Sequence, residues 1–273
     1  MSSTFSTLSA ATTAQELSDG FVAIAIAAGR LILEIYDTDF DVETKSDKSP
    51  VTEADQRAET LILAGLQKLC PTVPVVAEEE AAAGNIPEVS DRFILVDPLD
   101  GTREFVNKNG EFTVNIALVE QGVPTVGVVY APAKGRLFWT AGPGQAFEAS
   151  LDGRTDTTYA DPMPISVNQE DHPDGLVVVA SRSHRDHKTD ELLNHYKVRD
   201  MKAAGSSLKF CLVATGEADL YPRHGRTMEW DTAAGQAVLL GAGGVVNDLH
   251  GKPLLYGKNE FENPFFIAAN KAL

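Results

Sequence analysis

Apolar residues recur at intervals of three and four over residues 13–36, which is the period of one face of an α-helix. Thr13 can cap this helix, and Glu16 stands three residues later, where a capping box would place it. The polar stretch that follows contains a turn at 47–50 and predicts a hairpin, which leads into a second helix over about 54–69. The start of the chain is therefore expected to form two helices joined by a hairpin.

Strand-like patterns dominate the middle of the chain. VPVVAEEE and FILVDPLDGT are short apolar runs that end in acids, each typical of a buried strand, and residues 81–91 between them indicate a loop. FTVNIALVEQGVPTVGVVYAP predicts a hairpin with strands at 112–119 and 125–130, and a third strand is expected at 136–140. The turn-rich stretch 141–165 is the best candidate for a junction between two halves.

The rest of the chain alternates between strand-like and helix-like segments. GLVVVASRS, ADLYPR, GVVNDLHGKPLLY and FFIAAN indicate strands, whereas HKTDELLNHYK, SSLKFCLVATGEA and DTAAGQAVLLGAGG indicate helices. This order predicts α/β alternation after a more antiparallel first half. We therefore expect an N-terminal α+β half over 1–160, which carries most of the candidate chemistry, and a C-terminal α/β half over 161–273.

The charge of the chain narrows the choice of partners. The 273 residues include 39 acids and 23 bases, a net charge of -16, which argues against nucleic acid and against an anionic membrane surface. A small anionic substrate remains possible, because a bound cation reverses the field locally. The longest apolar stretch, 21–28, is too short to span a bilayer, and Cys70 and Cys211 are expected to be reduced. These features predict a soluble, cytoplasmic protein without an integral membrane segment.

Two carboxylates end the apolar run of FILVDPLDGT. Asp97 and Asp100 are costly at the end of a buried strand unless something pairs with them. Pro98 bends the segment between them, so that both side chains and the carbonyl of Leu99 can face one point. Gly101 then allows close approach of the backbone. A helix that begins here would point free N–H groups outward, where they favour phosphate.

Three other acidic positions can join this pair. Residues 78–80 end the neighbouring apolar run, Asp231 precedes a helical stretch and Asp55 stands in SPVTEADQRAE. Carboxylates gathered at one sheet edge repel each other and need a cation, and hard oxygen ligands suit Mg²⁺, which substrate phosphate often completes. Two such ions can polarise a phosphoryl group, activate water and stabilise the leaving oxygen.

Each of these acids also has an ordinary explanation. Asp231 can be an N-cap, and Asp100 can simply form a turn before Gly-Thr. Residues 78–80 can be a solvated loop. Asp55 can be an exposed acid in a first helical turn. The combination of two acids, a rigid proline and Gly-Thr after a buried strand carries more weight than any of these positions alone.

Three motifs resemble those of a known family. VVAEEE, VDPLDGTREF and EWDTAAGQAVLLGAGG resemble, in order and context, the metal-binding motifs of the inositol monophosphatase superfamily, which are magnesium-dependent, lithium-sensitive phosphomonoesterases. DGTREFVNKNGEFTVNIALVEQGVPTVGVVYAP, ASRSH and GSSLKFCLVATGEADLYPR are similar to its 3'(2'),5'-bisphosphate nucleotidase branch, of CysQ type. The similarity covers about residues 17–270. It implies a layered αβαβα sandwich, of α+β and α/β character, with a site between the two halves.

The resemblance also implies roles for particular residues. The implied metal ligands, for two or three Mg²⁺ ions, are Glu78 (with Glu79 as the fallback), Asp97, Asp100 and Asp231 through their side chains and Leu99 through its carbonyl. Thr102 and Asp55 would orient and deprotonate the attacking water. The amides of Gly101 and Thr102 would hold the phosphate, and Glu78, Leu99, Asp100 and Asp231 would also contact the substrate.

The nucleotide end of the substrate is implied to contact His184, Ser206, Lys209 and Arg223. Lys209 and Arg223 would bind the phosphate that is not cleaved. Lys209 can instead be a helix lysine that extends its amine to water, and His184 can be a solvated loop residue. Arg103 and Glu104 are expected to be structural or to lie at the rim.

The resemblance implies removal of the 3'-phosphate of adenosine 3',5'-bisphosphate, in sulfur assimilation. A phosphatase for inositol phosphates or sugar bisphosphates is the nearest alternative, because the metal-binding residues cannot separate these substrates. A non-catalytic metal- or nucleotide-binding protein with the same fold is the alternative from another class. The family includes monomers and homodimers, and some relatives associate peripherally with the inner membrane.

Overall fold

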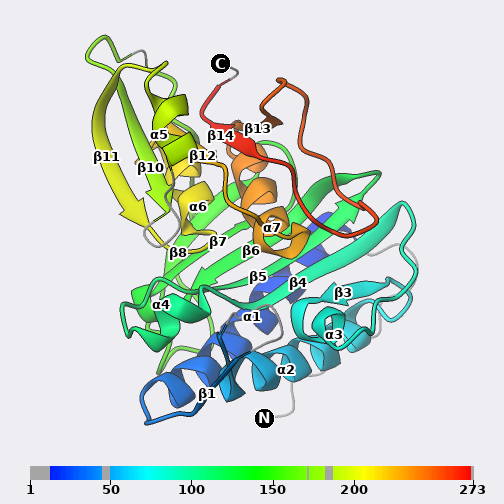
Figure 1. Cartoon of the computed structure of the whole chain (residues 1–273). Helices are drawn as coiled ribbons and strands as arrows, with labels where there is room; N and C mark the ends of the chain where they lie inside the picture. Colours follow the sequence, from blue (N-terminus) through cyan, green and yellow to red (C-terminus); the bar gives the residue numbers. More distant parts are fainter. Residues whose placement is uncertain (1–12, 45–49, 171, 182–186, 272–273) are drawn as a thin grey trace.

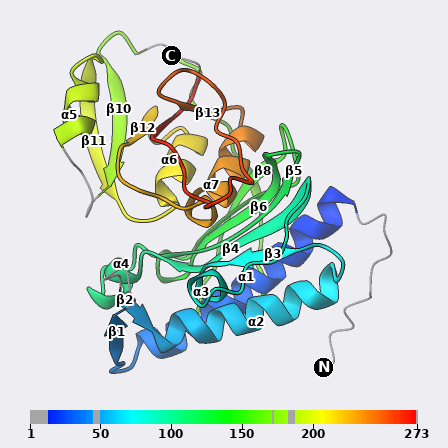
Figure 2. The ribbon, with the colours of Figure 1, turned by 45° about the vertical axis from the view of Figure 1, so that its right-hand side comes forward.

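Five layers of secondary structure are stacked in the computed structural model, in the order helices, sheet, helices, sheet, helix (Figure 2). The structure describes residues 13–44, 50–170, 172–181 and 187–271. The layers are those of the αβαβα sandwich that the resemblance implied. None of the described helices is both long and apolar enough to cross a membrane.

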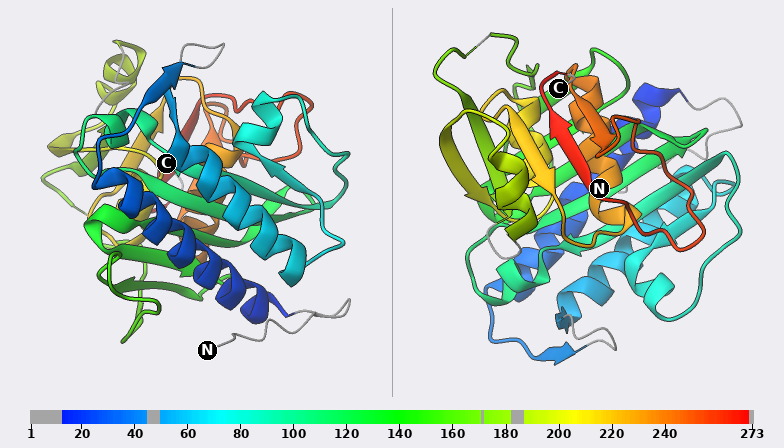
Figure 3. Two further views of the ribbon diagram at one scale, coloured as in Figure 1. Left: turned by 90° about the horizontal axis from the view of Figure 1, so that it is seen from below. Right: turned by 45° about the horizontal axis from the view of Figure 1, so that its top comes forward.

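The first layer consists of α1 (Ala14–Tyr36) and α2 (Glu53–Leu69), which lie side by side across one face of the larger sheet (Figure 3). The predicted capping box forms at the start of α1 between Thr13 and Glu16. The predicted hairpin also forms, from β1 (Val42–Thr44) and β2 (Pro50–Thr52), which pair antiparallel. Its turn at 47–49 lies outside the described residues.

The larger sheet has seven strands in the order β3-β4-β5-β6-β7-β8-β9, and only β3 and β4 are parallel. The strands are β3 (Val75–Ala77), β4 (Arg92–Asp100), β5 (Thr113–Glu120), β6 (Val123–Ala131), β7 (Arg136–Thr140), β8 (Ala146–Ser150) and β9 (Met163–Pro164). β8 and β9 of this sheet lie within 141–165, the stretch predicted as a junction between halves. β8 forms a hairpin with β7, and β9 pairs with β8 across a longer loop, so turn residues surround both strands. The division of the chain at 160 stays a prediction.

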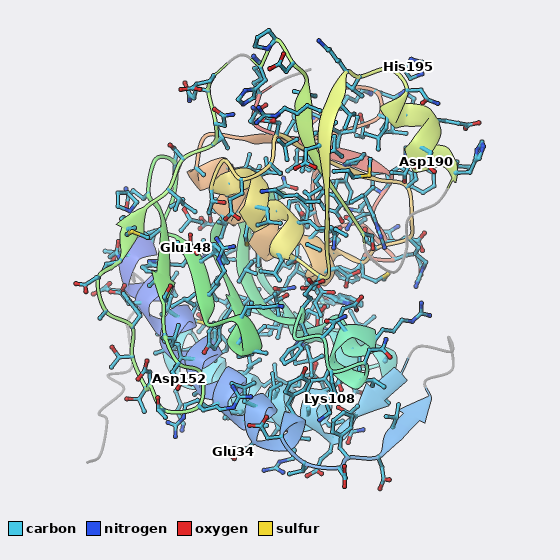
Figure 4. The ribbon with its side chains drawn as sticks, turned by 90° about the vertical axis from the view of Figure 1, so that its left-hand side faces the viewer. Glu34, Lys108, Glu148, Asp152, Asp190 and His195 are labelled. Atoms are coloured by element: carbon cyan, nitrogen blue, oxygen red, sulfur yellow. The ribbon has the colours of Figure 1, made fainter. Side chains whose placement is uncertain are left out.

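Two short helices follow β3 and β4 directly. They are α3 (Glu78–Ala82) and α4 (Thr102–Val106), so the loop predicted at 81–91 begins later than expected. Lys108, labelled in Figure 4, follows α4 and joins it to α1 by donating to the carbonyl of Tyr36. A 3₁₀ helix, η1 (Pro132–Lys134), links β6 to β7.

The smaller sheet has the order β11-β10-β12-β14-β13. Its strands are β10 (Leu176–Ser181), β11 (Val198–Ala204), β12 (Leu220–Arg223), β13 (Val245–Asp248) and β14 (Phe266–Ala269). β10 is parallel to both neighbours, whereas β14 is antiparallel to both of its own. The sequence pattern missed β11, since it is an edge strand rich in exposed polar residues.

The helices α6 (Leu208–Ala214) and α7 (Glu229–Gly241) fill the space between the sheets, and α5 (His187–Leu193) lies on the outer face of the smaller sheet. Figure 1 shows α7 across β4, β5 and β6. Gly127 on β6 permits this close approach, since a Cβ there would lie 2.7 Å from the Cβ of Ala237. The helix that carries Asp231 is therefore seated directly on the larger sheet.

Candidate active site

Acidic side chains from separate segments, those of Glu78, Asp97 and Asp231, lie close together at one edge of the larger sheet. Ala77 on β3 pairs in parallel register with Val96 on β4, so the next residues, Glu78 and Asp97, emerge beside each other. Asp231 approaches from the first turn of α7, where its Oδ2 accepts from the N–H of Met228 at 2.8 Å. The N-cap explanation of Asp231 is therefore wrong, because Met228 occupies the N-cap position and Asp231, the third residue of the helix, accepts its N–H.

A bulge in β4 changes the direction of the strand at the DPLD segment, residues 97–100. Asp97 pairs with Asn115 and Asp100 with Thr113, so β4 has one more residue than β5 between the two pairs. Pro98 has no N–H for the ladder, which explains why the irregularity falls here. The N–H of Leu99 turns inward and donates to Oδ1 of Asp97 at 3.0 Å.

The electrostatics of the site show that these acids influence one another. Burial raises the pKa of Asp97 well above its usual range, and Glu78, Asp100 and Asp231 raise it further. Burial does the same to the pKa of Asp231, with Asp100 and Glu78 adding to it. The pKa of Asp100 rises to about 6 through burial, although the nearby Lys209 opposes the rise. The four carboxyls therefore carry an electrostatic strain that a cation would relieve.

The donor chemistry fits Mg²⁺, although the side chains do not enclose an ion. Carboxylates and the carbonyl of Leu99 are all hard oxygen donors. Across the ranges described by the structure, no group of three or more His, Cys, Asp or Glu residues is arranged so that it could hold a metal as it stands. A hydrogen bond between Glu78 and Asp97 joins two of the predicted ligands and contributes to the raised pKa of Asp97. The metal-ligand set therefore stays a prediction.

The two residues predicted to activate water are in contact. The Oγ1 of Thr102 lies 3.1 Å from Oδ1 of Asp55 and 3.3 Å from the carbonyl of Leu99. The other carboxylate oxygen of Asp55 accepts from both the N–H and the hydroxyl of Thr52, each at 2.8 Å. Asp55 is 1% exposed, so its explanation as an exposed acid is wrong. One oxygen is fixed by the start of α2, and the other faces Thr102.

A cavity of about 400 Å³ lies at this edge of the sheet and is lined by residues from 100–104 and 181–232. Of the residues predicted to act, it is lined by Asp100, Gly101, Thr102, Ser206, Lys209, Arg223 and Asp231. Tyr221 and Arg226, which the sequence reasoning missed, line it as well. Arg103 is exposed in the wall and Glu104 is buried there, consistent with rim and structural roles. His184 lies outside the described residues.

Lys209 is buried in the cavity wall and does not extend to water. It is 4% exposed, so the explanation as a lysine that reaches solvent is wrong. Its Nζ donates to the carbonyl of Ser206 and lies 5.3 Å from the ring centroid of Tyr221. Burial lowers the pKa of Lys209 to about 8, although Asp100 favours its charged form. Arg223 lies nearby, and among the described residues its buried Nε has no hydrogen-bond partner.

Two polar residues that the sequence reasoning missed connect the acids of the two halves. Ser207 donates its hydroxyl to the carbonyl of Asp231 at 2.7 Å, and its N–H to the carboxylate of Asp100. Asn115, on β5, donates to Oγ of Ser207 at 3.1 Å and to Oδ2 of Asp100 at 3.4 Å. Most of these partners are far apart in the chain, so no local pattern could have indicated them.

Comparisons with known proteins agree with the resemblance seen in the motifs. The Inositol monophosphatase family matches residues 13–270. The 3'(2'),5'-bisphosphate nucleotidase CysQ of Escherichia coli K12 is 45% identical over 251 residues, which cover 91% of this chain and 97% of that protein. CysQ of Salmonella typhimurium LT2 is 46% identical, with 89% and 95% covered. The crystal structure of CysQ from Bacteroides thetaiotaomicron superposes with a TM-score of 0.77 at 36% identity, covering 93% of this chain and 97% of that one.

Proposed function

The chain belongs to the inositol monophosphatase family, and from that premise we propose that it is a 3'(2'),5'-bisphosphate nucleotidase. In this proposal it is a Mg²⁺-dependent phosphomonoesterase that hydrolyses the 3'-phosphate of adenosine 3',5'-bisphosphate to give AMP and phosphate. Relatives of 39–46% identity that carry this name over most of their length support the proposal.

The observation that carries the proposal is the division of charge within one cavity. The cavity lining includes the acids Asp100 and Asp231, whose pKa values are raised by burial and by the charge of Glu78. The same lining includes the basic residues Lys209 and Arg223. A substrate with two phosphates matches this arrangement, because one phosphate can meet cations held by the acids and the other can meet the basic side chains.

In the proposed reaction, Glu78, Asp97, Asp100, Asp231 and the Leu99 carbonyl would hold Mg²⁺ ions, which would neutralise these acids, polarise the phosphoryl group and make water more acidic. The residues of the chain orient the attacking water and the phosphate, and one of them accepts the proton.

Thr102 accepts a hydrogen bond from the attacking water while its own hydroxyl donates to Asp55, so that proton transfer can run toward the buried carboxylate. The N–H groups of Gly101 and Thr102 hold the phosphate. Asp231 lies next to the leaving oxygen, and Ser206 contacts the nucleotide.

The physiological setting follows from the same proposal. The enzyme would act in sulfonucleotide turnover during sulfur assimilation, in the cytoplasm, with two or three Mg²⁺ ions and with inhibition by Li⁺. A monomer or a homodimer is compatible with a cavity that one chain lines.

A phosphate-release assay over a panel of substrates tests the proposal. We expect rapid hydrolysis of adenosine 3',5'-bisphosphate that depends on Mg²⁺, and slower hydrolysis of an inositol monophosphate and of a sugar bisphosphate. Poor turnover of the nucleotide together with efficient turnover of either alternative would transfer the protein to another branch of the family. Absence of phosphate release from every substrate, with Mg²⁺ present, would refute an enzymatic function.

A further inference from the structure

Glu59 is a buried acid that belongs to neither the proposed ligand set nor the proposed substrate contacts. It lies on α2 and is 4% exposed. Its two carboxylate oxygens each accept a main-chain N–H, from Glu79 at 2.8 Å and from Glu80 at 2.9 Å. Burying a carboxylate is expensive unless it is hydrogen-bonded, and both oxygens of this one are.

These bonds cap a helix that cannot cap itself. The N-cap position of α3 is Ala77, which has no side-chain oxygen to offer the free N–H groups of the first turn. Glu59 supplies that oxygen from another helix. The residue that opens α3 is Glu78, the predicted ligand of the VVAEEE motif, so the carboxylate of Glu59 fixes the backbone immediately beyond Glu78.

The same face of α2 also contacts the segment that follows β4. Asp55 lies four residues before Glu59, one helical turn away, and accepts from Thr102 directly after β4. Four helical residues rise about 6 Å, and neighbouring strands lie about 4.8 Å apart. Two acids one turn apart can therefore reach the segments that follow two adjacent strands, and β3 and β4 are such a pair.

We propose that Glu59 is a positioning residue that holds Glu78 beside Asp97 by capping α3 from α2. This inference rests on the proposed function, because it presumes that Glu78 is a metal ligand. Glu59 acts through the backbone of α3, since each of its oxygens already accepts an N–H there. Residues that orient metal ligands typically change metal affinity or activity 10–100-fold when replaced.

The test compares three variants of the full-length protein. Glu59→Gln keeps the size of the side chain but turns an NH₂ group toward one of the two N–H donors. Glu59→Asp keeps the charge but draws the carboxylate back by one methylene. Glu53→Gln is the matched control, because Glu53 lies on the same helix and carries the same charge but is exposed and paired with Arg57.

Two readouts apply to each variant. One is the Mg²⁺ concentration that half-saturates phosphate release, and the other is direct binding of Mn²⁺ without substrate, followed by electron paramagnetic resonance well below the melting temperature. We expect both Glu59 variants to need about 10-fold more metal in both assays. The control should stay within about twofold of wild type, and high Mg²⁺ should restore most of the lost turnover.

Three results would overturn the inference. If folded Glu59→Gln bound metal as tightly as the wild type, whatever its melting temperature, Glu59 would have only a structural role. Wild-type behaviour of Glu59→Asp would show that only the charge matters. If the wild type bound no metal, the premise that Glu78 is a metal ligand would fail together with the metal chemistry of the proposed function. If the wild type bound metal but preferred a different substrate, the inference about Glu59 would still stand.

Discussion

Replacement of Asp100 by asparagine should stabilise the metal-free protein while it abolishes turnover. Asp100 stands in a cluster of acids where burial raises its pKa from the ordinary 3.8 to about 6. Asparagine removes the charge and keeps an oxygen that can accept from Asn115 and from the N–H of Ser207. The substitution therefore separates the electrostatic cost of the site from its packing.

The size and the pH window of the effect follow from the shifted pKa. At about 1.4 kcal/mol per pKa unit, the rise to about 6 corresponds to roughly 3 kcal/mol. The folded-state pKa lies above the unfolded value, so the folded protein binds more protons between pH 4 and 6 and loses stability as the pH rises through that interval. The variant lacks this loss. In a protein of this size, roughly 3 kcal/mol corresponds to about 6–10 °C in melting temperature.

Thermal melts in EDTA at pH 5, 6 and 7.5 measure the effect. We expect the difference in melting temperature between Asp100→Asn and the wild type to grow with pH, because the variant lacks the charge of Asp100, which also raises the pKa of Asp97 and Asp231. Mg²⁺ should raise the melting temperature of the wild type more at pH 7.5 than at pH 5, because protons compete for the same oxygens. The variant should respond much less to Mg²⁺.

Two outcomes would refute this reasoning. If metal-free Asp100→Asn melted at a lower temperature than the wild type at pH 7.5, the carboxylate of Asp100 would stabilise the fold. That result would contradict the mutual repulsion of the acids that the structure indicates. A variant that keeps the full Mg²⁺ response or wild-type turnover would place the metal chemistry elsewhere.

Thr102→Val removes the hydroxyl that donates to Asp55, so kcat should fall about 100-fold or more with little change in KM, in steady-state kinetics; Thr102→Ser is the control. The KM for adenosine 3',5'-bisphosphate should rise as the pH passes upward through about 8, where Lys209 loses its charge, and an identical rise in Lys209→Arg would contradict this origin. Gly127→Ala should reduce the free energy of unfolding by about 1–3 kcal/mol in urea titrations, because the new methyl meets Ala237 at 2.7 Å; an unchanged value would show that α7 can move away from the sheet.

Local patterns in the sequence determined most elements and indicated the candidate reactive groups. The period of apolar residues indicated the long helices, and the capping box at Thr13 located the start of the first one. The DPLDGT motif predicted a bend around Pro98, which appears as a bulge between Asp97 and Asp100. These features depend on interactions between residues a few positions apart, so the chain reveals them without its fold.

Only the tertiary structure decided how distant segments support one another. The edge strand β11 (Val198–Ala204) and the caps and bridges formed by Glu59, Asn115 and Ser207 join residues far apart in the chain, and ordinary composition does not mark them. Burial likewise decided that Lys209 stays in the cavity wall and does not reach water. Such contacts depend on which surfaces the packed layers bring within hydrogen-bond distance, and that is a property of the whole fold and not of any short segment.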